Sequence, residues 1–492
     1  MSASMGEGWV QYDIDRQAVP LLAESWSISK DFTTWTIKVR RGVQFHKGYG
    51  EMTAEDVAWS MNQWRENVNE TRTNVMEWYW NHPEGSFETP DDYTVVVDTG
   101  VPMPDYQYLD IVRTPGGQYV ASKKQTEEIG AEAANENIAT TGPWEIVEHK
   151  TGEFWKMRAV EDHCRKTPHF AEMVFWEIKE EASRLAGFQT GNLDTFTMSY
   201  DSIPAVLEVP GAKIMRVPNA ASMNLRIYGQ DYAEVGTPDQ RAAYNPDLPW
   251  VSASSDVNSP QWERASKVRW ALMYAIDIQT IIDTILGGYA EPGGVTFFEN
   301  HQHLLDPDTK WEYDLERAKQ LLAEAGYPGG GFSLTLTIAI RGAPSEVPVC
   351  QAIASMWRDI GIDVKFVNVP FATMRPSIVG RTYQGVTCHA GSPAPTPAQG
   401  FNGLSIKGSI YGITHPYLED RVYKAMEAVD PAERQRLEGE VGRFLYDGAH
   451  VRSLYTYDNV YPVGSRIEDW SEGITYGDLR YQSGFEWIRH RQ

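Results

Sequence analysis

Apolar and polar residues alternate along a short stretch near the start of the chain. Trp35, Ile37 and Val39 occupy every second position, and threonine, lysine and arginine stand between and after them. A period of two is typical of a strand that buries one face and leaves the other to solvent. The stretch therefore predicts a strand, and Gly42 predicts a turn shortly after it.

A helical pattern follows this strand. Val57, Met61 and Trp64 recur at a spacing of three and four residues, which is the period of one helix face. Thr53 stands where a hydroxyl can cap the first amides, and Glu55 puts negative charge at the positive end of the helix dipole. We therefore predict a helix that begins directly after Thr53.

The stretch 222–228 shows the same two-residue alternation as the first strand. Met223, Leu225 and Ile227 are apolar, whereas the residues between them are Asn224 and an arginine. This pattern predicts a strand with one apolar and one polar face.

Strands and helices alternate in the second half of the chain. Asp314 precedes a helical pattern that Gly326 ends, as an N-cap and a left-handed C-terminal residue do. A strand over 333–340, a helix that ends at Gly361 and a strand over 362–369 follow. Since a strand, a helix and a second strand in this order form a crossover unit, we predict that the two strands are parallel.

Further segments complete the predicted elements. An apolar stripe over 265–286 predicts one long helix. The polar stretch 230–263 before it, which contains several prolines, predicts a long surface connection. Asp430 and a following proline predict the start of the last long helix, and the residues 453–463 predict the strand after it.

The length of the chain predicts more than one compact unit. It has 492 residues, of which 42% are apolar, and about 150 residues per domain would give two to four units. No run of about 18 apolar residues suggests a membrane span. The first residues lack the basic and apolar segments of a signal peptide, so we expect a removed leader or, in preference, a truncated start.

Charge and cysteine content narrow the possible functions. Lysine and arginine number 44 against 67 acidic residues, and the net charge is −23. Such a chain repels phosphate backbones and anionic lipids, which argues against nucleic-acid or membrane-surface binding as its main task. Cys164, Cys350 and Cys388 form no CxxC pair, so a disulfide with one free thiol is possible and the pairing stays open.

Several segments spread along the chain resemble one protein family. They are LAESW before the first strand, TTGPWEIV near residue 144, VRWALMYAID near residue 272 and YDLERAKQLLAEAGY near residue 320. In this order they resemble the family 5 extracellular solute-binding proteins of ABC importers, the receptors of the peptide, oligopeptide and nickel type. The resemblance covers nearly the whole chain, and its strength lies in the ordered set of segments.

The resemblance implies an α/β fold with two lobes, of the periplasmic-binding-protein kind (type II, large cluster C), with hinge strands and an extra subdomain in lobe I. Lobe I would comprise residues 1–225, with the inserted subdomain at roughly 50–140. Lobe II would comprise 226–452, and 453–492 would return through a hinge strand to lobe I. A cleft at such a junction is where ligands bind.

The resemblance also implies a function. The chain would be a monomeric periplasmic or cell-surface receptor that captures a peptide-class solute between two lobes and delivers it to the permease subunits of an ABC importer, without a cofactor. An oligosaccharide or an opine-like acid is the alternative solute, and a hydrolase acting on a small solute is the alternative of another class. Because the G-x-S-x-G, H-E-x-x-H and P-loop motifs are missing, we predict no enzyme. Ligand identity and lipid anchoring stay open.

The resemblance also suggests where the solute binds. Peptide-binding members hold the peptide amine with an aspartate in a G-W-x-x-D-x-x-D-P loop, but Pro393 and Thr396 stand at those places here. Arg341 stays in register with an arginine that can hold the peptide carboxylate by charge-assisted hydrogen bonds. The expected ligand-binding residues are Arg341, His389, Ser392, Phe401, Tyr228, Tyr455 and Tyr457.

A metal site is not expected. Asp162, His163, Cys164 and His169 lie close together in the sequence, but their spacing matches no zinc template. We interpret them as polar loop residues.

Overall fold

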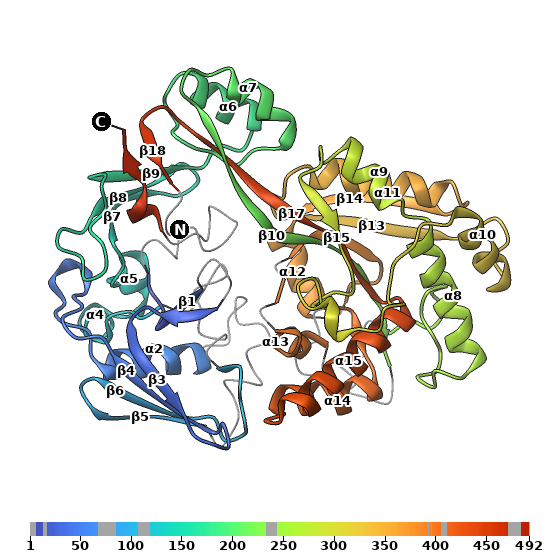
Figure 1. Ribbon diagram of the computed structural model, residues 1–492, viewed down its shortest axis with the longest axis horizontal. Helices are drawn as coiled ribbons and strands as arrows, with labels where there is room; N and C mark the ends of the chain where they lie inside the picture. Colours follow the sequence, from blue (N-terminus) through green and yellow to red (C-terminus); the bar gives the residue numbers. More distant parts are fainter. Residues whose placement is uncertain are drawn as a thin grey trace. The chain divides into compact units, whose positions relative to one another are not determined.

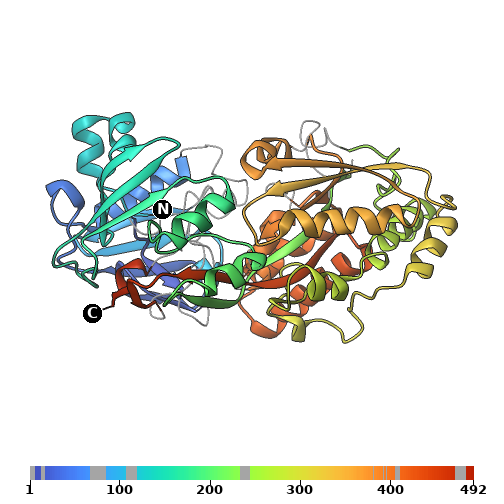
Figure 2. The same ribbon diagram turned by 90° about the horizontal axis from the view of Figure 1, so that it is seen from above.

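The chain divides into two compact units, which Figure 1 and Figure 2 show in two views. Unit 1 holds the described residues up to Val217 together with those from Asn459 onward, and unit 2 is Pro218–Asp458. The computed structural model describes residues 6–12, 17–66, 85–106, 119–232, 244–380, 382–391, 393–394, 396–404, 411–470 and 484–491.

Unit 1 is built around the strand predicted first. That strand is β4 (Thr34–Val39), and its side chains Trp35, Ile37 and Val39 are buried as the alternation predicted. It lies in a sheet of the order β3-β4-β6-β5, and α2 (Ala54–Glu66) packs against β5 and β6. The other strands of this sheet are β3 (Ala23–Ile28), β6 (Thr94–Asp98) and β5 (Ser86–Asp91).

The start of α2 differs in one detail from the predicted cap. The Thr53 hydroxyl donates to the Asp56 carboxylate at 3.1 Å, and that carboxylate accepts from the Thr53 backbone amide at 3.0 Å. Asp56 therefore supplies the backward half of a capping box, while the predicted bond from a helix amide to Thr53 is not formed.

The rest of unit 1 adds small sheets and short helices. A three-stranded antiparallel sheet has the order β7-β8-β9, and two-stranded pairs join β1 to β2 and β18 to β19. The bounds are β1 (Val10–Tyr12), β2 (Ala18–Pro20), α4 (Lys123–Ile129), α5 (Ala131–Glu136), β7 (Trp144–Lys150), β8 (Phe154–Ala159), β9 (Glu172–Trp176), α6 (Glu181–Gln189), α7 (Ile203–Leu207), β18 (Ile467–Asp469) and β19 (Arg489–His490).

Unit 2 is organised around a sheet whose described strands have the order β12-β17-β10-β15-β13-β14. The pair β13–β14 is parallel in the predicted crossover, with Ser333 opposite Asp363, so that prediction is confirmed. The bounds are β10 (Lys213–Ile227), β12 (Ala290–Pro292), β13 (Ser333–Ile340), β14 (Asp363–Pro370), β15 (Val386–Gly391) and β17 (Val451–Val463).

Helices flank this sheet. Asp314 accepts from the Arg317 amide at 2.8 Å at the start of α10, and Asp430 accepts from the Glu433 amide at 2.8 Å at the start of α15, so both predicted caps are confirmed. The helix bounds are α8 (Pro260–Tyr274), α9 (Ile278–Thr284), α10 (Leu315–Glu324), α11 (Glu346–Arg358), α12 (Phe371–Val379), α13 (Pro397–Phe401), α14 (Pro416–Glu427) and α15 (Pro431–Gly448), and a short parallel pair joins β11 (Gln230–Asp231) to β16 (Ile413–Thr414).

Two predictions for unit 2 are wrong. The stretch 265–286 holds two helices, because the Asp277 carboxylate accepts from the Thr280 amide at 3.0 Å and starts α9. The segment before α8 is not only a surface connection, since Trp250 is 2% exposed and donates its indole N–H to the Tyr228 carbonyl at 3.0 Å. Among the described residues, no helix has both the length and the apolar character to cross a membrane.

Candidate functional site

One face of the sheet in unit 2 is polar although it is buried. In the antiparallel pair β10–β15, Asn224 stands opposite His389 and Arg226 opposite Thr387. Directly opposed residues share a face, and so does Ser222 two positions before Asn224. None of these five residues is more than 5% exposed. We call them the polar face.

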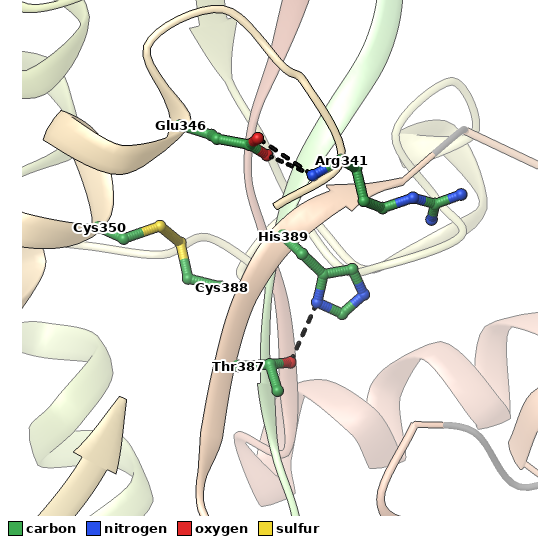
Figure 3. Close-up of a disulfide and its surroundings, with 6 residues drawn as sticks. All are labelled: Arg341, Glu346, Cys350, Thr387, Cys388 and His389. Carbon is green, nitrogen blue, oxygen red and sulfur yellow. Dashed lines mark hydrogen bonds between the residues drawn. A yellow bond between two sulfur atoms is a disulfide. The ribbon is translucent and has the colours of Figure 1, made fainter. Parts of the chain in front are cut away.

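The other side of the same strands is apolar. Met223, Leu225 and Ile227 are fully buried there, as the alternation predicted. Cys388 also lies on this side and forms a disulfide with Cys350 of α11. Figure 3 shows the Cys388 and His389 side chains leaving β15 in opposite directions. The disulfide therefore ties β15 to α11 behind the polar face.

Arg341 lies beside the polar face, at the end of β13. Its guanidinium donates to the Ala390 carbonyl at 3.0 Å and lies 4.4 Å from the centre of the Phe371 ring. The Glu346 carboxylate accepts from the backbone amide of Arg341 at 3.0 Å (Figure 3). It also accepts from the backbone amide of Gly342 at 2.7 Å. Through these two hydrogen bonds, Glu346 fixes the turn that carries Arg341.

His389 is a neutral imidazole at the centre of the polar face. Burial, followed by the positive charges of Arg226 and Arg341, holds its pKa well below the ordinary value. Its Nδ1 lies 3.1 Å from the Thr387 hydroxyl (Figure 3), and its Nε2 has no hydrogen-bond partner among the described residues. A neutral ring with one open nitrogen can donate to or accept from a polar solute, depending on its tautomer.

Glu299 is an acidic neighbour of the polar face that sequence reasoning missed. It follows β12 in a turn and is half-buried. Burial raises the pKa of its carboxyl to about 7, while the hydroxyls of Ser453 and Ser222 act against that rise. Ser222 belongs to the polar face, so Glu299 lies at its edge. No signal distinguishes this residue from the many other acidic residues of the sequence.

Two of the predicted aromatic residues pack as core side chains. Tyr228 is 3% exposed, lies in a cluster with Ala339 and meets Tyr383 edge to face, with 5.2 Å between ring centres. Burial raises the pKa of Tyr228. Phe401 is fully buried, with its ring centre 6.0 Å from that of Phe298. Of the two, Tyr228 contacts the polar face, through the Thr387 hydroxyl and the Arg226 guanidinium.

The remaining predicted residues lie on β17 or beyond the described residues. Tyr455 and Tyr457 stand opposite Pro292 and Ala290 of β12, and their ring centres are 6.0 Å apart. Since side chains two positions apart share a face, both lie on the same side as Ser453, next to Glu299. Ser392 lies outside the described residues.

Charges on and beside the polar face are not fully compensated. The buried atoms Arg226 Nε and Glu299 Oε2 have no hydrogen-bond partner among the described residues, and neither side chain forms an ion pair within them. The Arg226 guanidinium instead donates to the Tyr228 hydroxyl and lies 3.8 Å from the centre of the Tyr411 ring. Leaving buried charged groups unpaired costs free energy. The face is therefore suited to a solute that brings the missing polar groups.

A cavity of about 650 Å³ lies elsewhere in unit 2, between α8, α14 and α15. Its charged side chains already have partners: Arg443 pairs with Asp308 at 2.9 Å, and Arg436 pairs with Glu433 at 2.6 Å. A cavity whose charges are already paired gives a polar solute less to recognise than the polar face does.

The site offers groups for binding rather than for metal coordination. Within the described part of the chain, no group of three or more histidine, cysteine or acidic side chains could hold a metal ion. His163, which the sequence places in a cluster, lies with its Nε2 2.8 Å from the Thr141 carbonyl. The groups of the polar face can form hydrogen bonds and ion pairs with a bound molecule.

Comparison with known proteins gives one matching family. The family described as bacterial extracellular solute-binding proteins, family 5 Middle, matches residues 17–411. Heme-binding protein A of Haemophilus influenzae is 26% identical over 381 residues, which cover 72% of this chain and 63% of that protein. The chain thus matches less than two thirds of that relative. Glutathione-binding protein GsiB of Salmonella paratyphi A is 22% identical over 468 residues, which cover 91% of this chain and 82% of that protein.

A solved structure shows the same fold. The dipeptide-binding protein from Pseudoalteromonas sp. SM9913, crystallised with Met-Leu, matches with a TM-score of 0.80 and 17% sequence identity. The match covers 100% of this chain and 95% of that chain. At this identity the likeness concerns the fold alone.

Proposed function

The chain belongs to the bacterial extracellular solute-binding proteins of family 5, and we propose that it is the receptor of an ABC importer that binds a peptide-class solute on the polar face of unit 2. The observation that carries this proposal is a pair of buried atoms without a hydrogen-bond partner among the described residues, Arg226 Nε on the polar face and Glu299 Oε2 beside it. A solute with hydrogen-bonding and charged groups would satisfy them.

The positive groups favour a solute with a carboxylate. Arg226 and Arg341 both influence the same neutral His389, so two guanidinium groups lie near one imidazole. Guanidinium groups bind carboxylates by charge-assisted hydrogen bonds. A peptide carboxylate fits this environment, and so does the carboxylate of an opine-like acid.

The alternative solutes follow from one missing group. Pro393 and Thr396 carry no charge at the places where peptide-binding relatives are expected to hold the amine. If no other residue holds an amine, an acid without an amine or an oligosaccharide would bind as well as a peptide. The tyrosines of β17, Tyr455 and Tyr457, could then stack on a sugar ring.

Binding is proposed to change the relation of the two units. The chain passes between the units within β10, after Val217, and within β17, after Asp458. We propose these strands as hinges through which solute binding shifts an equilibrium between open and closed forms. Small-angle scattering with and without saturating solute should show a smaller radius of gyration with solute; an unchanged radius would overturn the hinge.

The remaining properties follow from the proposed role. We propose a monomer that works outside the cytoplasm, delivers its solute to permease subunits and catalyses no reaction. The disulfide Cys350–Cys388 suits an oxidising compartment.

A thermal-shift screen tests the solute class. Dipeptides, tripeptides, N-acetylated peptides, sugars and organic acids are added to the chain, to Arg341→Ala and to the control Arg317→Ala on α10, whose side chain is 41% exposed. We expect peptides to raise the melting temperature of the chain and of the control, and to raise that of Arg341→Ala less. If no peptide stabilises the chain, the peptide-class proposal is wrong.

A further inference from the structure

The backbone of β10 changes conformation close to the place where the chain first passes between the units. Asn219 lies two residues after Val217, the last residue of unit 1 on this strand, and has a φ of +47° although it belongs to β10. The other described non-glycine residues with positive φ lie outside the strands. The left-handed region is unfavourable for most residues, and asparagine is one of the few that enter it readily. At Asn219, β10 therefore departs from an ordinary strand.

Pro218 weakens the strand at the same place. It has no amide hydrogen to donate, and proline within sheets is found mainly at edges, strand ends and bulges. Proline also restricts the residue before it, here Val217, to extended conformations. Because φ is fixed at Pro218 and Val217 stays extended, Asn219 retains the widest choice of backbone conformation at this crossing.

Two side chains of β17 hold Asn219 in its conformation. The Asn219 amide donates to the Asp458 carboxylate at 2.9 Å, and the Thr456 hydroxyl donates to the side-chain oxygen of Asn219 at 2.9 Å. Thr456 and Asp458 are buried, so water competes little for these hydrogen bonds. Side chains two positions apart on a strand share a face, which explains how both reach the same residue. We call Asn219, Thr456 and Asp458 the clasp.

The clasp links the two places where the chain crosses between the units. Asp458 is the last residue of unit 2 before the second crossing, and Asn219 is the second residue of unit 2 after the first, so the clasp lies within unit 2. The Asp458 amide donates to the Tyr289 carbonyl at 2.9 Å, which fixes the backbone that carries the carboxylate. A change of φ at Asn219 turns its amide hydrogen relative to its own side chain. The two hydrogen bonds of the clasp therefore cannot both survive such a change.

We propose that Asn219 is the pivot of the first hinge strand and that Asp458 and Thr456 hold it in the left-handed conformation rather than an extended one. The clasp then sets the ratio of the two forms of the receptor, and through that ratio its affinity for the solute. Its residues act as positioning residues, because Thr456 and Asp458 lie on the side of β17 opposite to Tyr455 and Tyr457. This inference rests on the proposed function, since it assigns residues to the proposed hinge.

The distance between two spin labels measures the populations of the two forms. One label is attached to the exposed free Cys164 of unit 1, and the other to Glu316→Cys on α10 of unit 2, where the native side chain is 83% exposed. Double electron–electron resonance is recorded without solute and with Ala-Ala-Ala. The clasp variants are Asp458→Ala, Asn219→Ala and the conservative Asp458→Asn, which keeps an oxygen acceptor. The control Asp430→Ala removes a carboxylate that accepts a backbone amide at the start of α15, outside the clasp.

The expected result is a shift of the same sign in two independent variants. Asp458→Ala and Asn219→Ala should deplete the same population, and each should change the ratio about threefold to tenfold, the range for loss of one hydrogen bond. Asp458→Asn and Asp430→Ala should leave the ratio within about twofold of the native value. Melting temperatures without solute check that the variants are folded.

Calorimetry with Ala-Ala-Ala then connects the clasp to binding. The affinity should fall if the depleted population is the one that the tripeptide enriches, and should rise if it is the other, by no more than the factor measured for the ratio. A change of affinity with the opposite sign would overturn control of binding by the clasp.

The outcomes separate the clasp from the proposed function. If neither clasp variant changes the distances, or if the two shift them in opposite directions, the clasp is overturned, with or without peptide binding. If the native chain binds the tripeptide and keeps one unchanged distance, the hinge falls and the clasp falls with it. If the tripeptide does not bind, the peptide-class function falls, while the distances without solute still decide about the clasp.

Discussion

Unit 1 and unit 2 both bury charged side chains, but they compensate them differently. In unit 1, Glu7 pairs with Arg165 at 2.6 Å, Arg165 pairs with Glu486 at 2.7 Å, and the Thr141 hydroxyl donates to Glu7 at 3.1 Å. Burial by itself raises the pKa of Glu7, but Arg165 and His163 outweigh it and the pKa is lowered. The buried carboxylates of this cluster therefore each form an ion pair within unit 1.

In unit 2, Arg226 of the polar face and the neighbouring Glu299 form no ion pair among the described residues. The pKa of Glu299 is raised by burial to about 7, which is the opposite direction from Glu7. Two carboxyls of the same type are thus shifted apart because one has a cation beside it and the other does not. The difference teaches that burial alone does not identify a binding residue, whereas burial without a partner does suggest one.

The largest expected effect comes from breaking the compensated cluster of unit 1. Changing Arg165 to Met leaves two carboxylates, Glu7 and Glu486, buried without their cation. We expect a loss of about 3–5 kcal/mol in the free energy of unfolding, measured by urea denaturation. The control Arg158→Met removes an exposed ion pair with Glu145 and should cost less than about 1 kcal/mol. Equal losses of unfolding free energy in the two variants would show that the buried cluster stabilises the protein no more than an exposed ion pair does.

The next largest effect on stability is expected from removing the disulfide of unit 2. Changing Cys350 and Cys388 together to Ala removes a bridge across 38 residues, and we expect a loss of about 2–4 kcal/mol because the unfolded chain gains freedom. Melting curves measure the loss, and Cys164→Ser is the control because this exposed cysteine is free. A melting temperature that a reductant leaves unchanged would contradict this prediction.

A pH series sharpens the contrast between Glu299 and Glu7. In the folded chain Glu299 keeps its proton up to about pH 7, whereas in the unfolded chain it loses it near the ordinary value of 4.5. The folded state therefore binds more protons between these values, and its stability falls as pH rises through the window and levels off above it. The fall attributable to Glu299 is at most about 3 kcal/mol.

The Glu299→Gln variant isolates this contribution. The groups that act on Glu299 are the neutral hydroxyls of Ser222 on β10 and Ser453 on β17 and backbone amides of its own turn, so the pH effect belongs to one carboxyl. We expect the difference in unfolding free energy between the native chain and Glu299→Gln to change between pH 4.5 and 7. A constant difference would mean that Glu299 titrates normally.

The smallest expected effect on stability is at Arg226. Changing Arg226 to Met removes a buried cation that has no carboxylate partner in the described residues and is held by the Tyr228 hydroxyl and the Tyr411 ring, so the free energy of unfolding should change by less than about 1 kcal/mol in either direction. The same substitution should weaken tripeptide binding, measured by calorimetry. A loss as large as that of Arg165→Met would show that Arg226 is a structural cation, and the comparison between the units would fail.

Sequence reasoning predicted the elements whose signals are local. The strand Ser333–Ile340 has its predicted bounds, because the alternation, the turn before it and the following helix all agree. The caps at Asp314 and Asp430 were also predictable, since a short polar side chain before an apolar stripe identifies a helix start. At these positions the tertiary structure agrees with the local preference of the sequence.

One missed feature is local: the break before α9 follows from Asp277, whose carboxylate competes with continuation of the helix. Another feature depends on contacts distant in sequence. Trp250 is buried because its indole reaches the Tyr228 carbonyl and because Arg269 donates to the Trp250 carbonyl at 2.8 Å. No pattern within the stretch 230–263 carries this information, so its composition predicted a surface connection.

The candidate site was predictable only in part. Arg341 and His389 followed from the family resemblance, and the structure places them beside one another. Glu299 could not be found in this way, because its significance comes from what it lacks in three dimensions. A carboxyl acquires an unusual pKa through burial and missing partners, and neither is visible in a string of residues.

The disulfide behind the polar face also determines which side of β15 contributes to that face. Cys388 and His389 are neighbours, so a slip of β15 by one residue would turn the imidazole toward α11 and the sulfur toward the polar face. The bond to Cys350 is incompatible with that slip. It therefore serves as a marker of correct strand registry: a chain in which Cys350 and Cys388 are joined has already placed His389 on the side opposite α11.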